Sequence, residues 1–180
     1  MRRFLLLMIL LGSCIAASQP AYAQKDKKAA KKERQEALVA RGVFETVKGK
    51  KIVAVLNQAI PSGETRRAID DYPFKLINNR LTCNLPFFGS SSQSVWGSED
   101  LAIKADDRPV APQIGYNKEM GGYEFVFDFK TTNNAYWKCT LKIFADARVN
   151  ILMEGNRSSI KYEGYLDTEA IGELFKKEAR

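Results

Sequence analysis

The sequence contains no histidine, and this absence excludes a large part of enzyme chemistry. Without imidazole, neither Ser-His-Asp nor Cys-His nucleophilic catalysis is available, and no metal site can use histidine ligands. Acidic residues stand next to each other at three places: Asp70-Asp71, Glu99-Asp100 and Asp106-Asp107. Neighbours on an extended chain point to opposite sides, so adjacency does not bring two carboxylates together. We therefore predict no catalytic residue, no metal and no cofactor, and a protein that is not an enzyme.

A strong net charge is missing from most of the chain. The whole sequence carries +7, but residues 24–42 hold seven Lys or Arg against three acids, whereas residues 43–180 hold 19 against 18. The body of the protein is therefore nearly neutral. This excludes a broad basic surface shaped for nucleic acid, because the basic excess lies in one short N-terminal segment.

Long apolar runs are absent except at the N-terminus. Phe4–Ala17 carries no charge and follows two arginines, but fourteen residues are too few for a permanent membrane-spanning helix. Ala21-Tyr22-Ala23 then fits the pattern that signal peptidase recognises. We predict that residues 1–23 are a secretory signal cleaved between Ala23 and Gln24, which leaves a periplasmic or secreted protein without a transmembrane segment. A retained anchor helix is the alternative.

Cysteine is scarce, with three residues in the chain. Cys14 ends the sequence Leu-Gly-Ser-Cys, which is similar to a bacterial lipobox, so a lipid anchor in the outer membrane through Cys14 is an alternative to cleavage after Ala23. Cys83 and Cys139 would remain after cleavage. An oxidising compartment allows them to form a disulfide, whereas two separate buried thiols would act as small apolar side chains. The sequence leaves both alternatives open.

Residues 24–42 are rich in Lys, Ala and Glu, which are strong helix formers, and Gly42 stands where a helix commonly ends. We predict a basic helical linker that holds the following domain away from its surroundings. The alternative is a weak electrostatic contact of this helix with an anionic surface of the cell envelope.

From Lys51 onward, apolar residues recur with the period of two that is typical of β-strands. Tyr72–Ile77 and Arg80–Leu85 form a predicted hairpin around Asn78-Asn79, because asparagine tolerates the left-handed conformation that a type I′ turn requires. This register places Phe74 opposite Cys83 and keeps the apolar side chains on one face.

A second hairpin pairs Tyr123–Lys130 with Tyr136–Ile143. One register places Phe127 opposite Cys139 and also brings two charge pairs together, Asp128 with Lys138 and Glu124 with Lys142. Sliding one strand by two residues keeps the apolar face but separates both charge pairs. Each pair contributes only about 0.2–1 kcal/mol, yet together they select the register.

Further strands are predicted before, between and after these hairpins. They are Lys51–Gln58, Leu101–Ala105, Val110–Tyr116, Val149–Glu154 and Ser159–Leu166. About eight short strands in residues 43–180 predict an all-β domain, an antiparallel meander that closes into a small barrel or, alternatively, forms a β-sandwich. Residues 168–179 read as a C-terminal capping helix whose Ile171, Leu174 and Phe175 share one face.

A polar loop over residues 89–98 carries a single tryptophan, Trp96. Together with Phe87, Phe88 and Tyr116 it is a candidate ligand contact at one end of the barrel. The leading hypothesis is a non-enzymatic envelope protein that binds a small apolar or amphipathic ligand, or a protein partner, at this end. The alternative is a structural or assembly module whose barrel is filled by its own side chains, because large rings at Phe125, Phe127 and Phe129 would close a small barrel.

Short motifs give the chain a resemblance to a known family. They are the Ala-Leu-Val-Ala at the end of the charged helix, Pro61-Ser62-Gly63, Asp71-Tyr72, Leu85-Pro86-Phe87-Phe88-Gly89 and Ile160-Lys161-Tyr162-Glu163-Gly164-Tyr165. Over about residues 25–166 the sequence resembles the secreted proteins of Bacteroidetes-type bacteria catalogued as domain of unknown function 4251. The resemblance implies a lipocalin-like β-barrel in the cell envelope with no assigned activity.

Overall fold

A computed structural model describes residues 20–88, 102–156 and 158–167. The predicted signal, Cys14, Trp96 and the predicted helix 168–179 lie wholly or mainly outside these residues. The chain divides into two compact units, residues 1–38 and residues 39–180.

One helix, α2 (Pro20–Lys48), precedes the sheet. The predicted end of this helix at Gly42 is wrong, because α2 continues for six more residues. Val43 and Val47 in this extension are buried in the apolar core of the second unit, so burial outweighs the helix-ending tendency of glycine. The helix ends instead at Lys48, and Lys50 two residues later adopts the left-handed conformation with φ 51°. Among the described residues, no helix is both long enough and apolar enough to cross a membrane.

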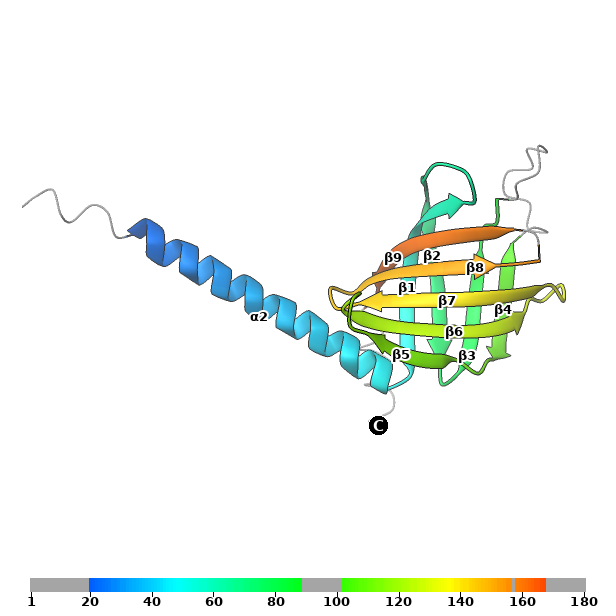
Figure 1. The fold of residues 1–180 in the computed structure, drawn as a ribbon, viewed down its shortest axis with the longest axis horizontal. Coiled ribbons are helices and arrows are strands. Elements are labelled where there is room, and N and C mark those ends of the chain that lie inside the picture. Colours follow the sequence, from blue (N-terminus) through cyan, green and yellow to red (C-terminus); the bar gives the residue numbers. More distant parts are fainter. Residues whose placement is uncertain (1–19, 89–101, 157, 168–180) are drawn as a thin grey trace, which may run out of the picture. The chain divides into compact units, whose positions relative to one another are not determined.

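Nine antiparallel strands follow α2 in the described part of the second unit (Figure 1). They are β1 (Lys51–Pro61), β2 (Arg67–Ile77), β3 (Arg80–Leu85), β4 (Ile103–Pro109), β5 (Gln113–Asn117), β6 (Gly122–Lys130), β7 (Tyr136–Phe144), β8 (Arg148–Glu154) and β9 (Ser159–Leu166). They belong to one sheet in the order β4-β3-β2-β1-β9-β8-β7-β6-β5. The all-β prediction is therefore confirmed, and a single sheet replaces the two sheets of the sandwich alternative.

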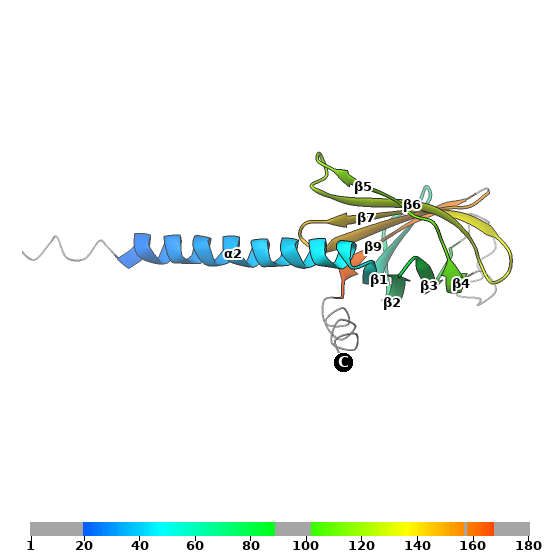
Figure 2. The same cartoon turned by 90° about the horizontal axis from the view of Figure 1, so that it is seen from below.

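The sheet curls into a half-barrel, so that β5 and β6 face β2, β3 and β4 (Figure 2). Closure into a complete lipocalin-like barrel is not confirmed, because β4 and β5 are the two ends of the sheet. The residues that join them lie between Pro109 and Pro112, and proline has no N–H to donate to a ladder. At one end of the half-barrel the N–H of Thr132 donates to the carbonyl of Lys104 at 2.9 Å, which links the loop after β6 to β4.

Both predicted hairpin registers are confirmed. Asn78 and Asn79 have φ values of 50° and 62°, as a type I′ turn requires, and Phe74 lies opposite Cys83. In the second hairpin Phe127 lies opposite Cys139, with both predicted charge pairs directly across the strands. The Glu124 and Lys142 side chains approach to 3.2 Å.

Strand boundaries shift where bulges and prolines intervene. β1 extends beyond the predicted Gln58 to Pro61, with a bulge between Leu56 and Gln58 that moves its register against both neighbours. β4 begins and ends later than predicted, and β5 is shorter than the predicted Val110–Tyr116. Bulges bend and twist strands locally, which contributes to the curl of the sheet.

The inner face of the half-barrel is one contiguous apolar cluster. Its largest fully buried side chains are Tyr162, Phe74, Phe125, Ile52, Leu56, Leu81, Leu85, Ile103, Leu141, Ile143, Ile151 and Met153. These side chains occupy the space that a ligand would need in a hollow barrel. Candidate binding surfaces therefore lie at the ends and on the outer face of the sheet.

Candidate functional site

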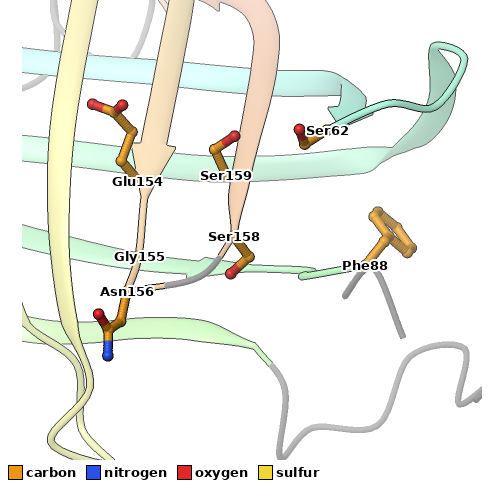
Figure 3. A pocket seen from close by; sticks show the side chains of 7 residues that line it. All are labelled: Ser62, Phe88, Glu154, Gly155, Asn156, Ser158 and Ser159. Atoms are coloured by element: carbon orange, nitrogen blue, oxygen red, sulfur yellow. The ribbon is translucent and has the colours of Figure 1, made fainter. Parts of the chain in front are cut away.

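A hollow of about 360 Å³ opens at the end of the half-barrel where β1 and β8 end and β9 begins. We call it the rim pocket (Figure 3). It is lined by Ser62, Phe88, Glu154, Gly155, Asn156, Ser158 and Ser159. The lining comes from three stretches of the chain that are far apart in sequence. The β1–β9 and β8–β9 ladders bring Ser62 to residues 154–159, and Phe88 comes from the segment that follows β3.

The backbone of the rim pocket is held by hydrogen bonds beyond the regular strands. Ser62 donates its N–H to the carbonyl of Ser159 at 3.2 Å, which continues the ladder between β1 and β9. Gly155 donates to the carbonyl of Ser158 at 2.8 Å and closes the turn between β8 and β9. The turn therefore fixes the backbone positions of Asn156 and Ser158. The pocket is thus built on the ends of strands and one tight turn.

The chemistry of the rim pocket is polar on one side and aromatic on the other (Figure 3). Three serine hydroxyls donate and accept hydrogen bonds, the Asn156 amide does both, and the Glu154 carboxylate accepts. Phe88 supplies one ring. Glu154 is the one charged side chain in the described lining, and the amino group of Lys138 lies 3.9 Å from it.

Side chains of the half-barrel anchor the segment Pro86–Phe88. The buried Tyr162 hydroxyl donates to the carbonyl of Pro86 at 2.7 Å. Phe87 packs edge-to-face on Trp137 with ring centroids 5.2 Å apart, and the Arg67 guanidinium lies 5.6 Å from the centre of the Phe88 ring. These contacts hold the aromatic side of the rim pocket in place.

Replacing Tyr162 with phenylalanine should destabilise the protein by about 1 kcal/mol, since the carbonyl of Pro86 loses its donor at a partly buried site. Urea denaturation monitored by circular dichroism measures this change. Tyr165→Phe is the matched control, because Tyr165 lies on the same strand and is 45% exposed. A Tyr162→Phe variant as stable as the parent would show that this hydrogen bond does not anchor the segment.

A second hollow of about 860 Å³ shares Glu154, Gly155, Asn156 and Ser158 with the rim pocket. It continues over the start of β7, where Tyr136 is 67% exposed. Gly155 lies close to the Trp137 ring, and a Cβ added at Gly155 would lie 3.1 Å from ring atoms. The residues of the β8–β9 turn therefore line both hollows, and the second one also has a large aromatic surface.

The structure brings only part of the predicted ligand site together. Phe88 lines the rim pocket and Phe87 packs behind it. Tyr116 lies elsewhere, on β5, where it stacks edge-to-face on Tyr123 at 5.2 Å. Trp96 lies outside the described residues. The serines and Asn156 were not predicted, because polar residues in turns are ordinary and their spatial convergence leaves no local sequence signal.

Two of the three acid pairs lie among the described residues, Asp70-Asp71 on β2 and Asp106-Asp107 on β4, whereas Glu99-Asp100 lies outside them. Asp107 accepts two hydrogen bonds from the Arg80 guanidinium, both at 2.6 Å. This hydrogen bonding lowers the pKa of the Asp107 carboxyl and raises that of Arg80. Asp70 and Asp71 are both exposed on β2. Within the described part of the chain, no three Cys, Asp or Glu side chains converge as metal ligands would.

Cys83 and Cys139 are both buried and both free. Both belong to the buried apolar cluster, and neither lines the rim pocket. Burial raises the pKa of the Cys83 thiol to about 12. The pKa of Cys139 is also raised, mainly by burial and secondarily by the neighbouring Cys83. Both groups are therefore neutral thiols near neutral pH, which gives them little nucleophilic character.

Comparison with known proteins gives one family and one fold. The family described as "Domain of unknown function (DUF4251)" matches residues 33–166. The crystal structure of a DUF4251 family protein from Bacteroides eggerthii DSM 20697 superposes with a TM-score of 0.53 and 14% sequence identity, covering 72% of this chain and 87% of that one. At this identity the likeness is one of fold. No curated protein matches the chain.

Proposed function

The chain belongs to the DUF4251 family, and from that premise we propose that it is a non-enzymatic protein of the cell envelope that holds a small hydroxylated ligand in the rim pocket. The family resemblance predicted from the sequence is confirmed over residues 33–166. The family has no assigned activity, so the proposal is argued from the pocket itself.

One observation carries the proposal, the composition of the rim pocket. Its hydroxyl, amide and carboxylate groups offer both donors and acceptors within one hollow, and Phe88 offers an apolar surface. A volume of about 360 Å³ lies near the lower end of the range of small-molecule sites. The Glu154 carboxylate is paired with the Lys138 amino group 3.9 Å away, so the described lining carries no unpaired charge and the pocket favours a neutral ligand.

The rim pocket fits a narrower class of ligand than the apolar or amphipathic molecule predicted from the sequence. A purely apolar molecule would need the interior of the half-barrel, where Phe74, Phe125 and Tyr162 are fully buried among their neighbours. An amphipathic ligand remains compatible, with its polar part among the serines and its apolar part on Phe88. The proposal therefore keeps the amphipathic ligand and moves it from the interior to the rim.

Native mass spectrometry of the protein purified from its own host tests the proposal. We expect a retained neutral molecule on the parent protein and its loss from the double variant Ser62→Ala and Ser159→Ala, because alanine removes the hydroxyl partners without adding bulk. Thr132→Val is the control, since Thr132 is exposed and does not line the pocket. A parent protein that carries no molecule under these conditions contradicts the proposal.

The second candidate is a structural or assembly module without a ligand. It is favoured by the contiguous apolar cluster that fills the inner face of the half-barrel. Under this candidate the serine variant and the parent would each give only the mass of the protein itself, with no added molecule. The two candidates are thus separated by one measurement.

The location and N-terminal contact belong to the same proposal. We place the protein in the periplasm or outside the cell, with the lipid anchor through Cys14 as the alternative. In the described part of the N-terminal helix, Lys31, Lys32 and Arg34 are exposed. These side chains support a weak, salt-sensitive contact with an anionic envelope surface.

A further inference from the structure

The two ends of the curled sheet differ in how they are protected against pairing with another strand. β4 carries Lys104, Asp106, Asp107 and Arg108 and ends at Pro109. Charge and proline are common protections of exposed edges. β5 reads Gln-Ile-Gly-Tyr-Asn and carries neither. β5 is therefore an end strand of the sheet that lacks the usual barriers to strand addition.

The apolar inner face of the sheet continues onto β5, where its side chains are exposed to solvent. Ile114 lies opposite Phe125, and Tyr116 lies opposite Tyr123, so both share the inward face. Phe125 is 2% exposed, but Ile114 is 46% and Tyr116 59% exposed. The inner face thus ends in two large apolar side chains that are open to solvent beside an end strand.

The sequence of β5 is self-complementary when it runs antiparallel to itself. With Gly115 opposite the Gly115 of another copy, Ile114 lies opposite Tyr116 and Gln113 opposite Asn117. Each Ile–Tyr contact is an aromatic–β-branched pair, a favourable combination across strands. Each Gln–Asn contact pairs two amides, and no charge is opposed by a like charge.

The backbone permits this register. In an antiparallel pair, residues that point their N–H and C=O outward alternate along a strand. The backbone groups that face the free edge belong either to Ile114 and Tyr116 or to Gln113, Gly115 and Asn117. With the axis at Gly115, each of these sets lies opposite the same set of the second copy, so hydrogen-bonded pairs form in both cases. At Gly115 no described atom lies within 4 Å of an added Cβ, so the outer face there is open.

We propose that β5 is a homodimerisation edge, at which a second copy of this chain adds its own β5 in antiparallel orientation about a two-fold axis at Gly115. We infer a second copy rather than an unrelated peptide, because the five residues of β5 supply both members of each favourable cross-strand pair. Such an interface is isologous, with the same patch on both subunits. The contact is independent of the rim pocket.

A disulfide placed on the two-fold axis tests the register. Gly115→Cys should form a covalent dimer under mild oxidation, because the two introduced residues face each other directly, whereas bridged Cα atoms must lie within about 7 Å. Gln113→Cys is the matched control on the same face of the same strand. Its counterpart lies four residues along the strand, about 13 Å away, so its cross-linked fraction should be about tenfold lower. The parent protein gives the background from its own cysteines.

Sedimentation velocity over a range of protein concentrations gives an independent measurement. The parent should form dimers as concentration rises, and Ile114→Lys should remain monomeric, because it places like charges on the shared edge. Tyr165→Lys is the control, because it changes another exposed aromatic residue, on β9. A parent that stays monomeric, or equal cross-linking by Gly115→Cys and Gln113→Cys, overturns the proposal.

Discussion

Replacing Gly164 with alanine is expected to destabilise the half-barrel by about 3 kcal/mol or more, and this is the largest effect of any single methyl group that we predict. Gly164 lies on β9 opposite Leu56, beside the bulge of β1. A Cβ at this position would collide with the carbonyl oxygen of Val55 and would lie 2.8 Å from the Cα of Leu56. Both obstacles are backbone atoms, which cannot rotate away as a side chain can.

Urea denaturation of Gly164→Ala measures the effect, and Gly115→Ala is its control. Gly115 also lies in a strand, but an added Cβ there meets nothing within 4 Å. Alanine should therefore be neutral or slightly stabilising at residue 115, since it restricts the unfolded chain. Equal stability of the two variants would mean that β1 and β9 are not as close at Gly164 as the structure has them.

The second large effect is a loss of stability at alkaline pH. The pKa of Cys83 rises from its ordinary value of 9.0 to about 12 in the folded protein because of burial. Burial also raises the pKa values of Cys139 and Tyr162. Between pH 9 and pH 12 the unfolded chain releases protons that the folded protein retains, so stability falls as pH rises. For Cys83 alone, this amounts to about 4 kcal/mol over the whole interval.

Thermal unfolding followed from pH 7 to pH 11 measures this dependence. The variant with Cys83→Ala and Cys139→Ala is the control, because it removes both buried thiols while leaving small apolar side chains in their places. It should lose less stability between pH 9 and pH 11 than the parent does, whatever its stability at pH 7. Parallel pH profiles for the parent and the double variant would show that the thiols do not contribute.

The registers of the two hairpins can be predicted from sequence because the information is local. In the first, Asn78 and Asn79 specify the turn, and the turn fixes the pairing of the flanking strands. In the second, the apolar alternation allows several registers, and the charge pairs between β6 and β7 select one of them. Neither argument needs any residue outside the hairpin.

The end of α2 and the openness of the sheet depend on contacts that sequence patterns do not show. Gly42 is a reasonable helix end by propensity, but Val43 and Val47 gain burial only if the helix continues. Eight or nine alternating strands are compatible with both a closed and an open barrel. The prolines at Pro109 and Pro112, beside the connection of β4 to β5, are visible in the sequence, yet their effect depends on which strands end the sheet.

The rim pocket could be predicted only in part for the same reason. Phe88 is visible as an aromatic residue next to a polar loop, whereas Ser62 and Ser159 are ordinary turn and strand-end residues. They become neighbours because β1 pairs with β9, which joins segments almost a hundred residues apart. A pattern search along the chain does not see such a pairing until the strand order is known.

The position of β9 has a consequence for biosynthesis. β1 to β4 and β5 to β8 are each consecutive runs of neighbouring strands, and β9 lies between β1 and β8. The ribosome therefore releases two four-stranded pieces before it makes the strand that joins them. Nascent chains that stop before Ser159 should contain two separate meanders, and only the last strand to be synthesised turns them into one structure.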